Sequence, residues 1–390
     1  MLKVGLILSL RGTWKGGINY FHNLLSCYRE HPDPELKVLI FTEHPEDAAK
    51  YESDAIEVHQ LPTITKDSPW YLLHRVFKKI RGYDPVLLRL LEHHKIDLLS
   101  YSSIGRQRRV DTLHWEPDFQ FKRLPQFFDP KVIAYRDANV ANAQLWGKIL
   151  LSSQAAANDF RHYYPELSSV KAHVMHFSSS EVLQVQPESR KVLASKFPVD
   201  KPYFFLPNQF WKHKNHRVVV DALLLADPSI RVICTGLMED YRDQAHVPRL
   251  LEAVRNAGLQ DRFICLGVVP YYSLVSLMHN SIAVLQPSLF EGWSSSVEEA
   301  KAMGKRVILS NIDVHLEQAP ERGNYFHPDS PDELAACLNL ANSEYSAEIE
   351  ESFVRQRPQR KLEMARAQAD AFARIMTISC GDTTVAKLPN

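Results

Sequence analysis

Two glutamates, Glu291 and Glu299, flank a serine-rich segment whose residue types suit the binding of an anionic ligand. The segment follows an apolar run and precedes a helical pattern that ends at Gly304, so the serines at 294–296 fall at a predicted helix start. Backbone N–H groups at a helix start lack an intrahelical partner and carry the positive end of the helix dipole. This position favours a phosphate or diphosphate, with Glu291 directed into a cleft and Glu299 within reach of a ribose hydroxyl.

A helix cap is the simpler explanation for part of this pattern. Ser296 and Glu299 have the spacing of a capping box, and so do Ser295 and Glu298. The cap is the better explanation for Glu298, and for Glu299 it stays open beside ligand binding. It explains neither Glu291 nor the glycine that follows it.

Two lysines and two glycines are further candidates for contact with a charged ligand. Lys212 and Lys214 precede a helical pattern, where a cation opposes the helix dipole. That placement favours Lys214, supported by Lys212, as the charge that neutralises a diphosphate, although both could be ordinary solvated lysines. Gly16 and Gly17 lie between a predicted strand and a predicted helix, so their backbone can approach a phosphate or sugar closely, unless they form only a tight turn.

Motifs for metals and nucleotide cofactors are missing from the sequence. There is no DxD pair and no His, Asp or Glu set with metal-ligand spacing, so we expect no metal ion and no cofactor. The sequence also lacks GxGxxG and Walker A motifs, which argues against a dinucleotide oxidoreductase. We therefore expect phosphate charge to be met by lysine and by a helix start.

The elements that must position these residues alternate between strand-like and helical patterns. Apolar runs without polar alternation, typical of parallel strands buried on both faces, occur at residues 1–10, 38–41, 96–101, 149–152 and 172–177. After a polar stretch at 184–201, further strands are predicted at 203–206, 232–235, 263–266, 282–285 and 307–309. Helices are predicted at 18–28, 85–93, 216–225, 247–257, 272–279 and 296–303.

This alternation predicts two α/β domains, each a doubly wound parallel sheet, that face a central cleft. We expect the boundary between residues 185 and 200, with domains at 1–190 and 200–358. Residues 359–379 have the composition of a long helix, which we expect to pack back across the domains. The tail at 380–390 carries no periodic signal and is expected to be disordered.

Composition limits the class of protein. The chain has 390 residues, which exceeds what one core usually organises, and its 46 basic and 46 acidic residues leave no net field for nucleic acid. The five cysteines are scattered without a CxxC spacing, which argues against a zinc site or a disulfide framework. No stretch approaches the roughly 20 apolar residues of a membrane span. We therefore expect a cytoplasmic protein, with peripheral contact at the inner membrane surface left open.

Beyond these patterns, the chain resembles a known family. The spacing Glu291-x7-Glu299, inside a Phe-Glu-Gly-Trp segment, resembles the signature of the retaining glycosyltransferase family 4 (glycosyl transferases group 1), which has the GT-B fold of two Rossmann-like domains. The resemblance covers most of the chain, is strong in the C-terminal half and weaker before residue 110. It extends to residues 15–18, 117–120, 124–128, 206–216, 305–311 and 320–323.

The resemblance implies a hexosyltransferase that moves a sugar, with retention, from a UDP- or GDP-linked donor to a saccharide or lipid-linked acceptor. Bacterial surface-polysaccharide synthesis is the implied setting. Glu291 would hold sugar hydroxyls and stabilise positive charge at the anomeric carbon, and Glu299 would hold the ribose. The donor-binding set is then Gly16, Gly17, Arg136, Asn208, Gln209, Lys212, Lys214, Glu291, Gly292, Trp293, Ser294, Ser295, Ser296 and Glu299.

The same resemblance leaves other functions open. The family often has a Gly-Arg pair where this chain has Asn208 and Gln209, which leaves Lys214 more of the charge compensation. A catalytically inactive nucleotide-sugar-binding protein, or a GT-B-like epimerase or phosphorylase, is the alternative.

The acceptor side is less well defined. Many family members place a histidine in the segment that corresponds to residues 114–121, and one such position is Phe121 here. Either Asp118 or His114 takes the polar role; we favour Asp118 as the N-terminal catalytic residue, with Arg136 as a contact to sugar or phosphate. A turn residue after proline is the alternative for Asp118.

A basic amphipathic helix is predicted at 70–83, where apolar residues at helical spacing alternate with arginines and lysines. Such a helix could lie on an anionic membrane and admit a lipid-linked acceptor, although packing of its apolar face on the core is the more common case. Arg106, Arg108 and Arg109 would extend this surface.

Overall fold

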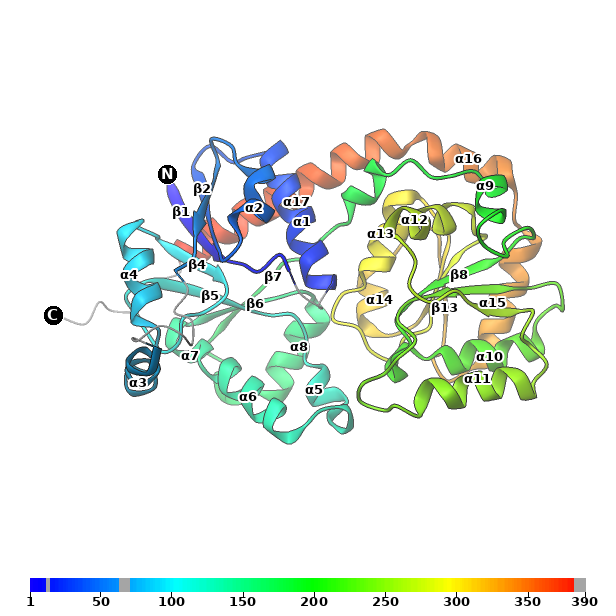
Figure 1. Cartoon of the computed structure of the whole chain (residues 1–390), viewed down its shortest axis with the longest axis horizontal. Coiled ribbons are helices and arrows are strands. Elements are labelled where there is room, and N and C mark those ends of the chain that lie inside the picture. The colour runs from blue at the N-terminus through cyan, green and yellow to red at the C-terminus, as the bar shows by residue number, and fades with distance from the viewer. Residues whose placement is uncertain (12–14, 63–70, 382–390) are drawn as a thin grey trace. The chain divides into compact units, whose positions relative to one another are not determined.

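The computed structural model describes residues 1–11, 15–62 and 71–381, which form two compact units. The N-terminal unit comprises Met1–Phe177 together with the chain from Ala365 onward, and the C-terminal unit comprises Ser178–Met364. Each unit is built on a parallel sheet that is flanked by helices (Figure 1).

In the part of the N-terminal unit that is described, seven parallel strands lie in the order β3-β2-β1-β4-β5-β6-β7. The strands are β1 Leu2–Ile7, β2 Leu36–Thr42, β3 Ile56–Gln60, β4 Leu98–Tyr101, β5 Asp111–Glu116, β6 Lys148–Leu151 and β7 Lys171–Val174. The helices are α1 Lys15–Glu30, α2 Pro45–Ala48, α3 Tyr71–Arg81, α4 Pro85–His93, α5 Gln120–Arg123, α6 Pro130–Ala141, α7 Ala143–Trp146 and α8 Gln154–Tyr163.

The C-terminal unit has a six-stranded parallel sheet in the order β10-β9-β8-β11-β12-β13. The strands are β8 Phe204–Pro207, β9 Val232–Thr235, β10 Phe263–Cys265, β11 Val284–Gln286, β12 Val307–Ser310 and β13 Gly323–Phe326. The helices are α9 Arg190–Ala194, α10 His216–Leu225, α11 His246–Asn256, α12 Tyr271–Asn280, α13 Ser295–Met303, α14 Asp313–Gln318, α15 Pro331–Ser343 and α16 Ala347–Arg355. A final helix, α17 Arg357–Gly381, follows.

Both faces of each sheet are covered, which explains why most of the strands are predominantly apolar. Phe204 of β8 lies in a core with residues of α10, α11 and α15, whereas its neighbour Phe205 lies in a core with residues of α12 and α13. In the N-terminal unit, Leu6 shares a core with α1 and α17, and Leu39 shares another with α4. Successive side chains of a strand point to opposite faces, so a strand between two helical layers has no polar side.

The division between the units falls earlier than the boundary that we predicted. Residues after Phe177 belong to the C-terminal unit because Val182 and Leu193 are buried in its core beside α12 and α13. The predicted C-terminal helix at 359–379 lies within α17, which begins at Arg357, and Phe372 and Met376 of that helix are buried in the core of the N-terminal unit. Of the predicted tail, residues 382–390 lie outside the described part of the chain.

Three strands were missing from the sequence prediction: β3, β5 and β13. Each carries polar residues among its apolar ones, so no continuous apolar run marks it. Among the helices that the structure describes, none combines the length and the hydropathy needed to cross a membrane.

Candidate functional site

The strand order of the C-terminal unit creates a switch point between β8 and β11, because the chain winds outward in opposite directions from these two neighbours. Ligands of doubly wound sheets bind outside the carboxyl ends of the strands at this place. The loops at this edge approach closely: a Cβ on Gly236, which has φ +137°, would lie 2.4 Å from the carbonyl oxygen of Asn208. The Asn208 side chain donates a 2.8 Å hydrogen bond from Nδ2 to Oε1 of Gln286, joining the ends of β8 and β11.

Glu291 and Lys214 form an ion pair at this switch point. The Nζ atom of Lys214 lies 2.6 Å from Oε1 of Glu291, and the Oγ atom of Ser288 donates to the same oxygen over 2.6 Å. The side chains are only 15% and 9% exposed, respectively, so little solvent screens the pair. Burial alone would raise the pKa of Glu291, but the ammonium group of Lys214 lowers it below its ordinary value. Glu291 is therefore an anion.

The short turn that carries Lys214, residues Lys212–Lys214, is fixed from the β9–α11 loop. The carboxylate of Asp240 accepts a 2.9 Å hydrogen bond from the backbone N–H of Lys212. Arg242 donates to Nδ1 of His213 over 3.2 Å, and because an arginine only donates, this nitrogen must be unprotonated. Burial, with Lys214 nearby, lowers the pKa of His213 to about 3, so the ring stays neutral. The turn therefore presents Lys214 to Glu291 and places a neutral histidine ring beside it.

The start of α13 lacks the capping box that the sequence allowed. Ser294 is the N-cap residue and makes no side-chain cap hydrogen bond. The amide of Gln318 holds it instead: Oε1 accepts from the Ser294 N–H at 3.3 Å, and Nε2 donates to the Ser294 carbonyl at 3.0 Å. Gln318 also donates to Oε1 of Glu298 over 2.8 Å. Glu298 thus helps to fix the side chain of Gln318 by accepting this hydrogen bond. The backbone N–H groups of Ser295 and Ser296 belong to the first turn of α13, where N–H groups lack an intrahelical acceptor.

Glu299 does not cap the helix either. The hydroxyl of Tyr271 donates to its Oε1 atom at 3.1 Å, and among the residues that the structure describes Oε2 has no hydrogen-bond partner. Burial raises the pKa of Glu299 to about 7, an effect that Tyr271 opposes. Glu299 is therefore a buried carboxyl with one oxygen available for a ligand hydroxyl.

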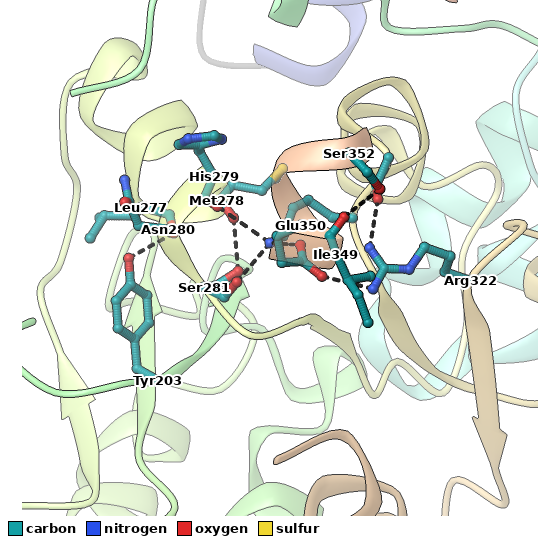
Figure 2. Close-up of polar contacts among 12 residues, drawn as sticks. Tyr203, Leu277, Met278, His279, Asn280, Ser281, Arg322, Ile349, Glu350 and Ser352 are labelled. Carbon is teal, nitrogen blue, oxygen red and sulfur yellow. Dashed lines mark hydrogen bonds and ion pairs between the residues drawn. The ribbon is translucent and has the colours of Figure 1, made fainter. Parts of the chain in front are cut away.

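The far end of α13 is anchored by a buried ion network (Figure 2). Arg322 donates to the carbonyl of Gly304, just past the helix, over 3.1 Å and contacts Glu350 over 2.7 Å. Lys305, which is almost fully buried, contacts Glu350 at 2.6 Å and donates to the carbonyl of Ser281 at 2.7 Å. Burial lowers the pKa of Lys305 to about 8, although Glu350 opposes this shift. The helix that begins at the candidate site is thus fixed at both ends.

The structure brings together the predicted residues of the C-terminal half. They lie in the loops that follow β8 and β11 and in the first turns of α13: Asn208, Gln209, Lys212, Lys214, Glu291, Gly292, Trp293, Ser294, Ser295, Ser296 and Glu299. The remaining predicted residues, Gly16, Gly17, Asp118 and Arg136, belong to the N-terminal unit.

The two glycines near the N-terminus differ from the prediction. Helix α1 begins at Lys15, so Gly16 and Gly17 lie in its first turn and not in a loop before it. The residues at 12–14 lie outside the described part of the chain. The glycines remain at a helix start, where backbone N–H groups lack intrahelical partners.

Around Asp118 the structure shows a turn and a buried ion pair. The carboxylate of Asp118 accepts the backbone N–H of Gln120 at 2.9 Å, the contact expected of a turn residue. Arg136 lies 3.7 Å from the Asp118 carboxylate but contacts Glu116 more closely. Phe121 is fully buried under the guanidinium of Arg136, so this position is part of the core. His114 lies on β5, and burial lowers its pKa to about 4.

Sequence reasoning missed four polar residues of these sites. Ser288 lies three residues before Glu291 and could have been noticed there. Gln318 contacts Ser294 from 24 positions away and Tyr271 contacts Glu299 from 28, so no local pattern marks either one. Glu116 is the last residue of β5, a strand that was not predicted; burial raises its pKa to about 7, although Arg136 opposes this.

Comparison with known proteins agrees with this geometry. The profile of the family described as "Glycosyl transferases group 1" matches residues 187–358. No curated protein sequence matches the chain.

Solved structures match the chain over nearly its full length. A glycosyltransferase from Rickettsia africae ESF-5 is 14% identical, with 98% of this chain and 99% of that one covered and a TM-score of 0.65. Anabaena Alr3699/HepE in complex with UDP is 15% identical, with 97% and 100% covered and a TM-score of 0.65. Sucrose-phosphate synthase from Thermosynechococcus elongatus is 14% identical, with 97% and 99% covered and a TM-score of 0.65. The predicted α/β architecture with two Rossmann-like domains is confirmed: the chain has the GT-B fold, and its residues 187–358 match glycosyl transferases group 1.

Proposed function

We propose that the protein is a metal-independent, retaining hexosyltransferase that moves a sugar from a UDP- or GDP-linked donor to a hydroxyl of a saccharide or lipid-linked acceptor. The observation that carries this proposal is the Lys214–Glu291 ion pair beside the uncapped start of α13, at the switch point of a doubly wound sheet. Surface-polysaccharide synthesis at the cytoplasmic side of a membrane is the setting that we propose for it.

Lys214 is suited to the donor diphosphate. An ammonium group has three N–H donors, and Glu291 takes one of them, so the others remain for phosphate oxygens. The first-turn amides of Ser295 and Ser296 supply the helix-dipole contribution on the same anion. Together they would stabilise the charge that develops on the leaving nucleoside diphosphate without a divalent ion.

Glu291 is suited to the sugar. Its carboxylate is held ionised by Lys214, so it can accept hydrogen bonds from sugar hydroxyls and stabilise positive charge at the anomeric carbon. Glu299 would accept the ribose hydroxyls through Oε2. Complexes of the similar Anabaena protein contain UDP and UDP-glucose, which supports a nucleotide-sugar donor for the present chain.

On the acceptor side we propose Asp118 with Arg136, and we add Glu116 as a second candidate. Both carboxylates lie at or just after the carboxyl end of β5 and share the guanidinium of Arg136. With a pKa near 7, Glu116 could exchange a proton with an acceptor hydroxyl near neutral pH.

We also propose that helix α3 makes peripheral contact with an anionic membrane. Its residues Val76, Phe77 and Ile80 are 53%, 48% and 76% exposed, which is unusual for apolar side chains on an amphipathic helix that packs on a core. The predicted start of this helix at Trp70 lies outside the described residues. Backbone hydrogen bonds at the end of α3 bring a second basic segment beside it, so the surface carries the cations Arg75, Lys78, Lys79, Arg81, Arg106 and Arg108.

Vesicle sedimentation tests this contact. We expect binding to vesicles that contain phosphatidylglycerol, weak binding to pure phosphatidylcholine, and loss of binding in Phe77→Ser/Ile80→Ser. Leu340→Ser, at a similarly exposed site in the C-terminal unit, serves as the control and should bind as the wild type does. If Phe77→Ser/Ile80→Ser bound these vesicles as well as Leu340→Ser does, α3 would be ruled out as the membrane contact.

Release of free nucleotide from a panel of UDP- and GDP-linked sugars tests the enzymatic function. We expect the wild type to hydrolyse one donor slowly and to transfer faster when acceptor is added, whereas Glu291→Ala should do neither while it stays folded. Glu252→Ala, an exposed glutamate on α11, is the matched control and should retain activity. Near-normal turnover by Glu291→Ala would refute the assignment, and nucleotide binding without any turnover would favour a binding protein.

A further inference from the structure

A buried chain of hydrogen bonds lies behind the carboxylate of Glu291. The Ser288 hydroxyl, which donates to Glu291 over 2.6 Å, belongs to a fully buried side chain two residues past the end of β11. Glu291 is thus held from two directions, by Ser288 of its own loop and by Lys214 of the loop after β8.

The chain continues into the neighbouring strand. Ser310, the last residue of β12, donates from Oγ to the carbonyl of Ser288 over 2.6 Å. Its hydroxyl is also buried, so this hydrogen bond is not exchanged with solvent. The contact ties the loop that carries Ser288 and Glu291 to the adjacent strand.

His315 of α14 closes the chain. Its Nδ1 atom lies 3.0 Å from the carbonyl oxygen of Ser310 and 3.1 Å from the Ser310 hydroxyl. Because the carbonyl only accepts and the hydroxyl proton is directed to Ser288, a proton on Nδ1 is the arrangement that satisfies both contacts. The ring is fully buried, and in the described part of the chain Nε2 has no hydrogen-bond partner. Burial lowers the pKa of His315 to about 4, so the ring is a neutral donor at this place and not a second cation beside Lys214.

We propose that Ser288, Ser310 and His315 are positioning residues that fix the carboxylate of Glu291 for its contact with the donor sugar. This inference rests on the proposed function, and it assigns roles to three side chains behind Glu291 that act through hydrogen bonds within the protein. Ser288 acts directly, because it is a hydrogen-bond donor to the ionised form of Glu291. Ser310 and His315 act through the backbone of Ser288, by holding the loop at the distance that the hydroxyl needs.

The chain of hydrogen bonds predicts a specific effect of Ser288→Ala. Loss of a hydrogen bond to an anion raises the pKa of the carboxyl. We expect the pKa of Glu291 to rise by about one unit in Ser288→Ala, which is a tenfold lower acid dissociation constant. The acid limb of the kcat profile should move to higher pH, with kcat about tenfold lower and KM within about twofold of wild type. Ser288→Thr retains a hydroxyl and should restore the wild-type profile.

At the far end, His315→Asn keeps an N–H near the position of Nδ1, whereas His315→Leu removes it. We expect the asparagine variant to resemble the wild type and the leucine variant to shift the profile in the same direction as Ser288→Ala.

A readout that does not need turnover separates this inference from the proposed function. Carbon-13 labelling of glutamate, with the Glu291 signal assigned by its loss in Glu291→Gln, reports the pKa of Glu291 directly. The inference is supported if the pKa of Glu291 is raised in Ser288→Ala and returns to the wild-type value in Ser288→Thr, even if no donor is turned over. An unchanged pKa in folded Ser288→Ala overturns it. If the alanine variant does not fold, Ser288→Cys, which keeps the volume and donates weakly, takes its place with the same two outcomes.

Discussion

The buried carboxyl of Glu299 should make donor binding depend on pH near neutrality. Its pKa is raised to about 7 by burial, and Tyr271 is the residue that opposes the shift. Ribose hydroxyls donate hydrogen bonds to an ionised carboxylate, so the donor should prefer the deprotonated protein and release a proton when it binds to the protonated one.

The size of the effect follows from the pKa. For a group that titrates near 7, the ionised fraction falls from about three quarters at about pH 7.5 to about one tenth at about pH 6. If only the ionised form binds the ribose well, Kd for the nucleotide sugar rises roughly eightfold over that interval. The diphosphate of a nucleotide sugar is a diester and remains ionised throughout, so the ligand adds no titration of its own.

Isothermal titration calorimetry with UDP-glucose and a GDP-linked sugar measures this directly. The wild type should show the weakening toward acid pH, and Glu299→Gln should bind more weakly with an affinity that is nearly independent of pH. Tyr271→Phe removes a hydrogen bond that lowers the pKa of Glu299, so its midpoint should move to higher pH. Glu252→Gln, with an exposed carboxyl, should follow the wild type.

An equal Kd at both pH values in the wild type would refute the role of Glu299 at the ribose. The same conclusion would follow if Glu299→Gln kept the full pH dependence, because another group would then be responsible.

Three further predictions concern the cation and the two ends of α13. Lys214→Met should weaken donor binding by about 2 kcal/mol, roughly thirtyfold, in calorimetry, and Lys212→Met by less; equal losses would contradict the assignment. Gln318→Leu removes the amide that holds the start of α13, so urea unfolding should show about 1–3 kcal/mol lower stability together with weaker donor binding, and unchanged binding would disprove the link. Glu350→Gln leaves the buried Lys305 without its carboxylate and should cost about 3 kcal/mol while Lys305 is charged. Loss of Glu350 lowers the pKa of Lys305 below its wild-type value of about 8, so the variant lysine gives up its proton at lower pH than the wild type does. The loss in stability should therefore shrink as pH rises toward about 8 and stay constant above it, and a loss that grows with pH would contradict the network.

The fold was predictable because its strands are buried on both faces. Runs such as Phe204–Pro207 and Val307–Ser310 are apolar throughout and separated by helical patterns, which is enough to specify a doubly wound sheet. Strand β5 was missed since Asp111, His114 and Glu116 interrupt its apolar residues. The acidic residue at its end was missed with it.

The site was predictable only where its members lie in one segment. The spacing of Glu291 and Glu299 is visible in the sequence, but the sequence alone could not decide between a helix cap and a ligand contact for Glu299. That choice depends on Tyr271 and Gln318, which reach α13 from other elements through the tertiary fold. The roles of the donor-side residues stay predictions until a ligand is bound.

A crystal structure of the protein with the tighter-binding nucleotide sugar would test the central claim most directly. We predict the diphosphate within hydrogen-bonding distance of the first-turn amides of α13 and of Nζ of Lys214, with Glu291 against the sugar hydroxyls and Glu299 against the ribose. A diphosphate bound away from the carboxyl ends of β8 and β11, with the Lys214–Glu291 pair untouched, would contradict it.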